Sequence, residues 1–83
     1  MRAIEKSVQK HQQAFAETVY EMRVENNYTQ GELAVMAGVD RKTINRIENG
    51  HFSPSLDTMV RLAHAFGVPF GSVADSVSET VGA

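Results

Sequence analysis

The side chains best suited to bind a ligand lie in the segment RKTINRIEN, residues 41–49. If this segment is helical with Ile44 and Ile47 turned inward, a step of about 100° per residue puts its basic and amide side chains on the solvent side. Arginine and lysine donate hydrogen bonds to guanine O6 and N7, and asparagine pairs with adenine N6 and N7. Such a face is suited to reading base edges, but by itself the pattern favours an ordinary solvated helix face. The outward residues are Arg41, Lys42, Asn45, Arg46 and Asn49.

The acidic residue of this segment, Glu48, changes that balance. On the same helical projection it falls about 40° from Ile44, near the buried side. A buried carboxylate needs a partner, because removal of a charge from water is costly. Arg23 is the best candidate, and the alternative is two exposed, unpaired charges. We therefore predict a structural ion pair between Arg23 and Glu48 that would fix how the segment is presented.

A long first helix over residues 2–25 is predicted from apolar residues that recur at helical spacing. The pair Asn26–Asn27 suits the C-terminal end of such a helix. Ile4 and Val8 begin earlier than a small bundle needs, so they would pack on the C-terminal helix, on a second subunit or on another protein, or belong to a frayed arm. The whole apolar stripe consists of Ile4, Val8, Phe15, Val19 and Met22.

Two short helices should follow, joined by a tight turn. Thr29, with Glu32 three residues later, forms a capping box that starts a second helix ending near Ala37. Asp40 caps a third helix over residues 41–49. Two helices joined by only three or four residues must turn sharply against each other, which defines a helix-turn-helix unit.

Two further helices complete the predicted fold. Ser55 caps a fourth helix, and a short fifth helix is expected over residues 69–74, with Phe70 and Val73 as its apolar residues. Residues 76–83 are small and polar, and we expect them to be frayed. The predicted fold class is therefore all-α with five helices. The expected apolar face of the fourth helix consists of Leu56, Met59, Val60, Ala63 and Phe66.

Length and composition bound the possible functions. A chain of 83 residues holds one domain with one small core. With no cysteine, it has no disulfide, no thiolate zinc site and no cysteine nucleophile, and its three histidines are too far apart to suggest a metal site. Neither a membrane span nor a signal peptide is found, which indicates a cytosolic protein. No nucleophile–base pair or phosphate-binding loop stands out, so we expect no enzyme and no cofactor.

The charge balance is misleading at first sight. Eight Lys and Arg stand against ten Asp and Glu, a formal net charge of −2, which argues against nucleic acid. The distribution is uneven, however, because residues 41–46 carry three cations and no acid. Glu17, Glu21 and Glu25 form an acidic row on the first helix and are expected to face elsewhere. The total therefore does not exclude a nucleic-acid-binding face.

The stretch from Met22 to Val68 reads MR-x5-TQ-x2-LA-x2-AGV-x3-TI-x2-IE-x-G-x3-PSL-x5-LA-x-A-x-GV. It resembles the lambda-repressor-like, Xre-type helix-turn-helix domain of bacterial and phage regulators, over about residues 15–74. The resemblance implies a sequence-specific, double-stranded DNA-binding transcriptional regulator, more often a repressor than an activator and often autoregulatory. With it we expect a helical extension at residues 1–13, the helix-turn-helix domain at 14–75 and a flexible tail at 76–83.

The resemblance also implies roles for individual residues. In the family, the glutamine at the position of Gln30 contacts a phosphate and buttresses the recognition helix, and the arginine and glutamate at the positions of Arg23 and Glu48 form an ion pair. His51 either joins the phosphate contacts or is an ordinary loop residue. The implied phosphate contacts are Thr29, Gln30, Asn49 and His51. The implied base-reading residues are Arg41, Lys42, Thr43, Asn45 and Arg46.

Assembly leaves the most alternatives open. A dimer on a palindromic operator would double the DNA contact, and its candidate interface consists of Val68, Phe70, Val73 and Val77. The alternative is that these residues simply close the core. In a second class of function, that of an antitoxin or adaptor, residues 1–13 would bind a partner protein. A coactivator without sequence-specific DNA binding is a third interpretation, and no membrane partner is expected.

Overall fold

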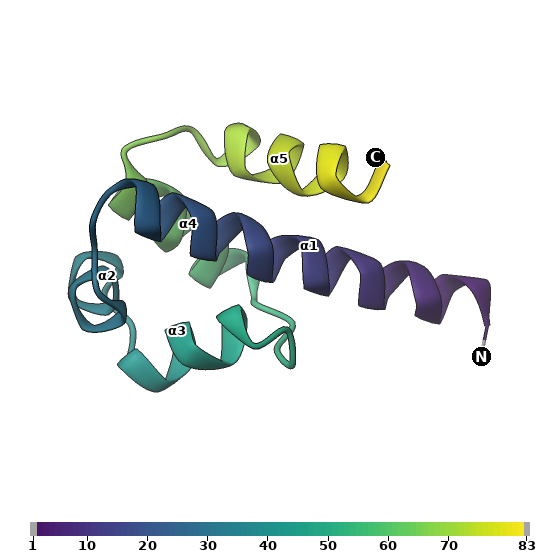
Figure 1. Ribbon diagram of the computed structural model, residues 1–83, viewed down its shortest axis with the longest axis horizontal. Coiled ribbons are helices and arrows are strands. Elements are labelled where there is room, and N and C mark those ends of the chain that lie inside the picture. Colours follow the sequence, from purple (N-terminus) through teal and green to yellow (C-terminus); the bar gives the residue numbers. More distant parts are fainter. Residues whose placement is uncertain (1, 83) are drawn as a thin grey trace.

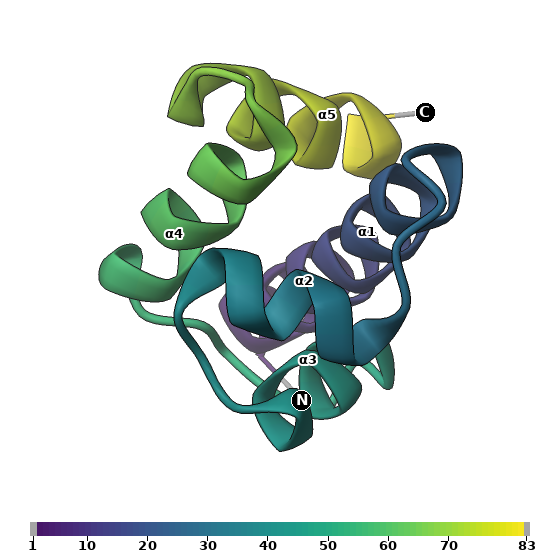
Figure 2. The ribbon, with the colours of Figure 1, turned by 90° about the vertical axis from the view of Figure 1, so that its left-hand side faces the viewer.

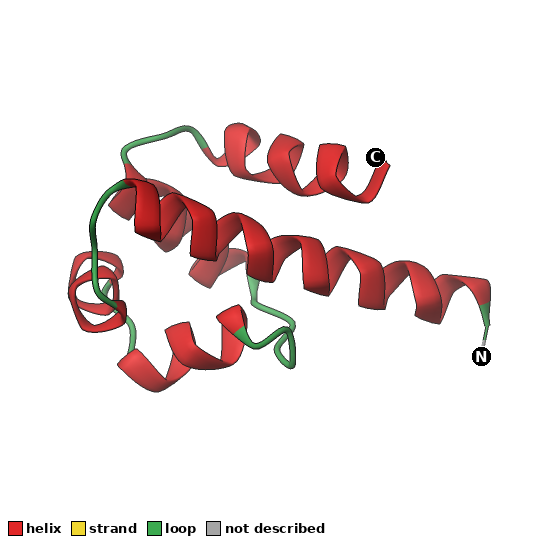
Figure 3. Cartoon of the chain, in the orientation of Figure 1, coloured by secondary structure: helices red, strands yellow, loops and turns green. Residues whose placement is uncertain are grey.

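The computed structural model describes residues 2–82, and over these residues the chain forms helices and loops without a strand (Figures 1 and 3). The predicted all-α class is confirmed. Among the described helices, none is both long enough and apolar enough to cross a membrane. The helices are α1 (Ala3–Glu25), α2 (Gln30–Ala37), α3 (Arg41–Glu48), α4 (Leu56–Phe66) and α5 (Phe70–Gly82).

Helix α1 is the element around which the others are arranged. It contacts α5 on one side and α3 on the other (Figure 1), and α2 and α4 complete the bundle (Figure 2). Phe15 and Val19 of α1 are buried in the centre of this arrangement. The first turns of α1 extend past the ends of α3 and α5 (Figure 1). Ile4 is 66% exposed, and Val8, 46% exposed, lines a hollow together with residues of α5.

The turn between α2 and α3 forms largely as the residue types dictate. The Thr29 hydroxyl oxygen accepts a hydrogen bond from the Glu32 amide, and Glu32 accepts one from the Thr29 amide, which confirms the capping box. Gly38 ends α2 at φ 69°, a left-handed conformation that glycine adopts without steric cost. Asp40 occupies the N-cap position of α3, but its side chain makes no capping hydrogen bond, so that part of the prediction is wrong.

The core takes apolar side chains from all five described helices, and α4 contributes a different face from the one predicted. Leu56 and Val60 were expected in the core but are 62% and 47% exposed. Val60 lies about 140° from the centre of the buried face, and Leu56 lies in the first turn of the helix at the edge of that face. The buried face of α4 consists of Leu62, Ala63, Ala65 and Phe66, with Met59 partly buried beside them.

The fifth helix is longer than predicted. It continues to Gly82 instead of ending near residue 74, so the expectation of a frayed segment is wrong for residues 76–82. The last residue, Ala83, lies outside the described part of the chain. Val73 is buried, and Val77, one turn later, packs against the core, which holds the helix down.

Hydroxyl groups of small polar residues in α5 form hydrogen bonds within the helix. The hydroxyl of Ser76 donates to the carbonyl oxygen of Ser72 at 3.0 Å, and that of Thr80 donates to the carbonyl oxygen of Ser76 at 2.9 Å. Such bonds to the preceding turn let serine and threonine reside in a helix whose apolar face is anchored elsewhere. Polar composition alone was therefore a poor sign of fraying here.

Replacing Val77 by alanine tests whether the second half of α5 contributes to stability. We expect Val77→Ala to lower the free energy of unfolding by about 1–2 kcal/mol, because it removes methyl groups that pack against the core. The measurement is urea unfolding followed by circular dichroism. Ser78→Ala, at the adjacent exposed position, is the control and should change little. Equal stabilities for the two variants would mean that α5 is not docked beyond Val73.

Candidate nucleic-acid interface

Helix α3 presents a basic, amide-bearing outer face. Ile44 and Ile47 are 0% and 1% exposed, so the opposite side of α3 is turned to solvent. Thr43 is half-buried at the edge of this outer face. Helix α2 packs against α3 at the same end of the molecule (Figure 2). The exposed side chains, which enclose a hollow of about 320 Å³, are Arg41, Lys42, Asn45 and Arg46.

The charges on and around this face are separated by sign. Arg41, Lys42 and Arg46 are exposed together on α3, whereas the side chain of Glu48 is enclosed against Arg23. Asp40 is the nearest exposed acid in the sequence and lies just before the helix. The outer face of α3 is therefore locally cationic, although the whole chain carries a net charge of −2.

The expected ion pair between Arg23 and Glu48 is present and joins the end of α1 to the end of α3. Arg23 Nε donates to Glu48 Oε2 at 2.6 Å, and Arg23 Nη2 donates to Glu48 Oε1 at 3.0 Å. The two side chains are only 15% and 6% exposed. Two parallel hydrogen bonds between a guanidinium and a carboxylate give a directional, charge-assisted contact. This contact fixes the position of α3 relative to α1.

The guanidinium of Arg23 makes further contacts. Its Nη1 donates to the carbonyl oxygen of Tyr28 at 2.8 Å, which ties down the loop before α2. Its Cζ lies 5.4 Å from the centre of the Tyr20 ring, a cation–π distance. The hydrogen bond to Glu48 raises the pKa of Arg23 above its already high ordinary value, while burial opposes this effect. Arg23 is therefore charged under all ordinary conditions.

A run of amide side chains leads from Glu48 to the outer face. Gln30 Nε2 donates to Glu48 Oε1 at 3.2 Å, and Asn45 Nδ2 donates to Gln30 Oε1 at 3.4 Å. Asn49 Nδ2 then donates to Asn45 Oδ1 at 3.1 Å. Sequence reasoning missed the last two bonds. The four-residue spacing of Asn45 and Asn49 along one helix is the signal that could have revealed their contact.

The remaining candidate phosphate contacts border this face. Thr29 is exposed, and because its oxygen accepts the capping bond, its hydroxyl proton stays free to be donated. His51 is exposed and lines a polar hollow of about 420 Å³ together with Gly50 and glutamines of α1. Close to it, Gln12 Nε2 donates to Ser53 Oγ at 2.5 Å, a link between α1 and the loop after α3 that sequence reasoning also missed.

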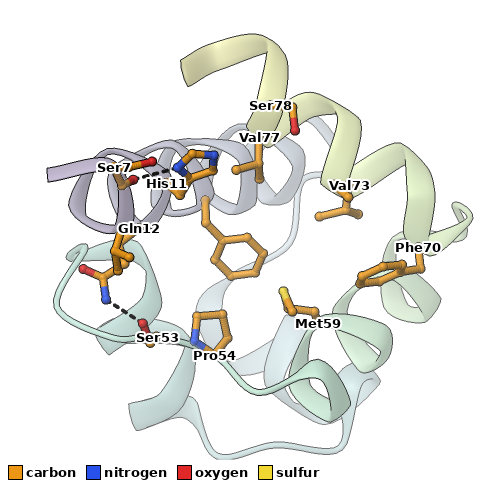
Figure 4. A pocket seen from close by; sticks show the side chains of 13 residues that line it. Ser7, His11, Gln12, Ser53, Pro54, Met59, Phe70, Val73, Val77 and Ser78 are labelled. Atoms are coloured by element: carbon orange, nitrogen blue, oxygen red, sulfur yellow. Dashed lines mark hydrogen bonds between the residues drawn. The ribbon is translucent and has the colours of Figure 1, made fainter. Parts of the chain in front are cut away.

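A separate apolar cleft of about 390 Å³ is lined by residues of α1, α4, α5 and the loop after α3 (Figure 4). Three residues of the candidate dimer patch, Phe70, Val73 and Val77, line this cleft. Val73 is 2% exposed and belongs to the core, and Val68 and Val77 are partly buried against it. Val73 therefore closes the core, as the alternative interpretation has it, and is not a free surface residue. Phe70, at 38% exposed, is the member of the patch that is open to solvent.

The family of the chain follows from a comparison with known proteins. A family model described as "Helix-turn-helix" matches residues 19–73, which contain α2, α3 and α4 entirely. Because this match covers well over half of the chain, the protein belongs to the helix-turn-helix family, in its Xre-type branch, as the motif indicates.

Individual relatives are transcriptional regulators. The transcriptional repressor RstR of the cryptic phage CTXphi from Vibrio cholerae is 36% identical over 66 residues, which are 80% of this chain and 57% of that protein. A helix-turn-helix transcriptional regulator from Methanothermobacter thermautotrophicus is 47% identical over 49 residues, which are 59% of this chain and 71% of that protein. The chain thus spans little more than half the length of RstR.

Solved structures show the same fold. The clp gene regulator ClgR from Corynebacterium glutamicum matches with a TM-score of 0.80 at 19% identity, over 87% of this chain and 77% of that chain. The restriction-modification controller protein C.AhdI from Aeromonas hydrophila matches with a TM-score of 0.72 at 26% identity, over 75% of this chain and 94% of that chain. These relatives and neighbours carry the names of regulators.

Removing the carboxylate of Glu48 tests the structural weight of the ion pair. Glu48→Ala leaves the Arg23 charge enclosed without its partner, so we expect a loss of about 3 kcal/mol in the free energy of unfolding. The melting temperature, measured by calorimetry, should fall by roughly 10 °C or more. The control is Asp57→Ala, which breaks the exposed Arg61–Asp57 pair and should cost less than about 1 kcal/mol. Similar melting temperatures for both variants would contradict a structural role.

Proposed function

We propose that the protein is a transcriptional regulator that binds double-stranded DNA sequence-specifically, with α3 in the major groove and α2 across the backbone. The observation that carries this proposal is the cationic, amide-bearing outer face of α3, whose helix is held in place by the Arg23–Glu48 pair. A helix fits the width of the major groove, and exposed arginine, lysine and asparagine side chains match the hydrogen-bonding groups of base edges. Membership in the Xre-type family supports the same function.

Base edges and phosphates would be contacted by different residues. Phosphate contacts fix register and orientation, whereas base contacts supply the sequence preference. With only three cations on the outer face, non-specific binding should be weak at physiological salt, because few counterions are released. The proposed backbone set is Thr29, Gln30, Asn49 and His51. The proposed base-reading set is Arg41, Lys42, Thr43, Asn45 and Arg46.

Arg46→Ala tests the proposed base-reading face. We expect the affinity for an operator, selected by the wild-type protein from random duplex DNA, to fall by about 1–3 kcal/mol, with relaxed preference at the position that Arg46 contacts. Fluorescence anisotropy with the selected duplex and its single-base variants gives both quantities. Arg61→Ala, which removes the same kind of side chain from an exposed site on α4, should leave binding within about twofold of wild type. Equal binding by wild type and Arg46→Ala would overturn the assignment.

A dimer on a palindromic operator, acting as an autoregulatory repressor, is the form of this function that we infer. One recognition helix reads only a few base pairs, so two copies with half-sites about one helical turn apart would supply the missing specificity. Phe70 is the exposed apolar side chain of the candidate patch. A second copy that covers Phe70 would also cover one edge of the apolar cleft.

Phe70→Ser tests this interface without opening the core. We expect the mass measured by light scattering to fall toward that of one chain while the circular dichroism spectrum stays that of a folded helical chain, because Phe70 lies outside the core. The matched variant is Ile4→Ser with Val8→Ser, which removes exposed apolar residues from the N-terminal part of α1. A fall in mass with this double variant, and none with Phe70→Ser, would show that the interface lies on α1 and not at Phe70.

A second candidate function is supported by the same exposed residues of α1. Ile4 is 66% exposed near the start of α1, and Val8, 46% exposed, lines the apolar cleft that α1 shares with α5. An antitoxin or adaptor would use residues 1–13 to bind a partner protein. In that case the Ile4→Ser, Val8→Ser variant would keep both its DNA binding and its mass, and would lose only a protein that co-purifies with the wild-type chain.

A further inference from the structure

The amide groups between Glu48 and the outer face of α3 form a continuous chain of hydrogen bonds with one direction. The chain runs from the carboxylate through Gln30 and Asn45 to Asn49, with donor–acceptor distances of 3.2, 3.4 and 3.1 Å. In each link a side-chain NH2 group donates toward Glu48, and the oxygens of Gln30 and Asn45 accept from the next amide of the chain. We call Glu48 and these three amides the amide relay.

The carboxylate of Glu48 dictates this direction. Both of its oxygens accept hydrogen bonds from the guanidinium of Arg23, and a carboxylate has no proton to donate. Gln30 must therefore turn its nitrogen to Glu48, which leaves its oxygen facing Asn45. Asn45 must in turn face Gln30 with its nitrogen and Asn49 with its oxygen. Reversal of the Asn45 amide alone would set oxygen against oxygen and nitrogen against nitrogen, and would break two hydrogen bonds at once.

The direction of these hydrogen bonds sets the orientation of the Asn45 amide at the protein surface. Its side chain is exposed on the outer face, and each of its amide atoms keeps one unused hydrogen-bonding position. An amide oxygen accepts from the amino groups of adenine and cytosine, whereas an amide nitrogen donates to the keto oxygens of guanine and thymine. A fixed amide therefore distinguishes amino from keto bases at a given point, while a freely turning one accommodates both.

We propose that Glu48 and Gln30 are positioning residues that fix which end of the Asn45 amide meets a base, and so determine whether the protein prefers an amino or a keto base there. This inference rests on the proposed DNA-binding function and deepens it. It makes a side chain enclosed between α1 and α3 responsible for part of the sequence preference, although Glu48 itself is turned away from the outer face.

The relay is tested first in the free protein, without DNA. In Gln30→Met the link to Glu48 is lost, so the side-chain NH2 resonances of both Asn45 and Asn49 should move in a 15N–1H spectrum. Asn49 is the decisive residue, because it is connected to Gln30 only through Asn45 in the relay. Val35→Ala, at an 83% exposed position of the same helix, is the control and should move neither. Unchanged Asn49 resonances in Gln30→Met would overturn the relay.

The base preference is tested on a duplex that the wild-type protein selects from a random pool. At the position read by Asn45, wild type should distinguish amino from keto bases by about tenfold, and Gln30→Met should reduce this ratio to about twofold or less. Ratios at the other positions should stay, even if overall affinity falls through a lost phosphate contact. If Gln30→Met does not fold, Gln30→Ala replaces it, since alanine favours helices.

Asn49→Ala is the matched control for this measurement. It removes an amide of the relay but leaves Asn45 connected through Gln30 to Glu48, so the amino–keto ratio should be retained. Equal loss of the ratio in Asn49→Ala and Gln30→Met, or wild-type ratios at every position in Gln30→Met, would overturn the role of Glu48. A wild-type chain that selects no sequence would overturn the proposed function, while the resonances still decide whether the relay exists.

Discussion

The ion pair between Arg23 and Glu48 is the contact on which the arrangement of the helix-turn-helix unit depends. It joins the last turn of α1 to the last turn of α3, and the same guanidinium holds the Tyr28 carbonyl before α2. One side chain thus joins the end of α1, the loop before α2 and the end of α3. Because both charges are largely enclosed, each one needs the other, and the site tolerates the loss of neither partner easily.

Local chemistry carried most of the prediction of the fold. The capping box at Thr29, the glycine at position 38 and the apolar spacing of Ile44 and Ile47 gave the helix-turn-helix unit with its boundaries nearly correct, because each is decided by near neighbours. The failures concern long-range packing. The buried face of α4 and the length of α5 depend on contacts with the other helices. The polar composition of residues 76–82 gives no sign that Val77 packs against the core.

The candidate site also has one part that the local sequence predicts and another part that depends on contacts between helices. The type and outward direction of Arg41, Lys42 and Arg46 follow from the sequence alone, since helical periodicity places them opposite two buried isoleucines. The Arg23–Glu48 pair was also within reach, because an enclosed carboxylate demands a partner. The sequence does not predict the hydrogen bonds among Gln30, Asn45 and Asn49. Those bonds depend on the distances between helices and on the donors and acceptors of each group.

The contact between the middle of α1 and the residues that follow α3 has a mechanical consequence. Gly50 adopts φ 75°, and a Cβ atom there would lie 2.7 Å from Gln13 Oε1, so the glutamine fills the space that the glycine leaves. One residue earlier in α1, the side-chain amide of Gln12 donates a hydrogen bond to Ser53 Oγ. These two contacts tie the middle of α1 to the loop that follows α3. A molecule bound to the exposed first turns of α1 would therefore hold a helix that is itself joined to the end of α3, without touching the outer face of α3.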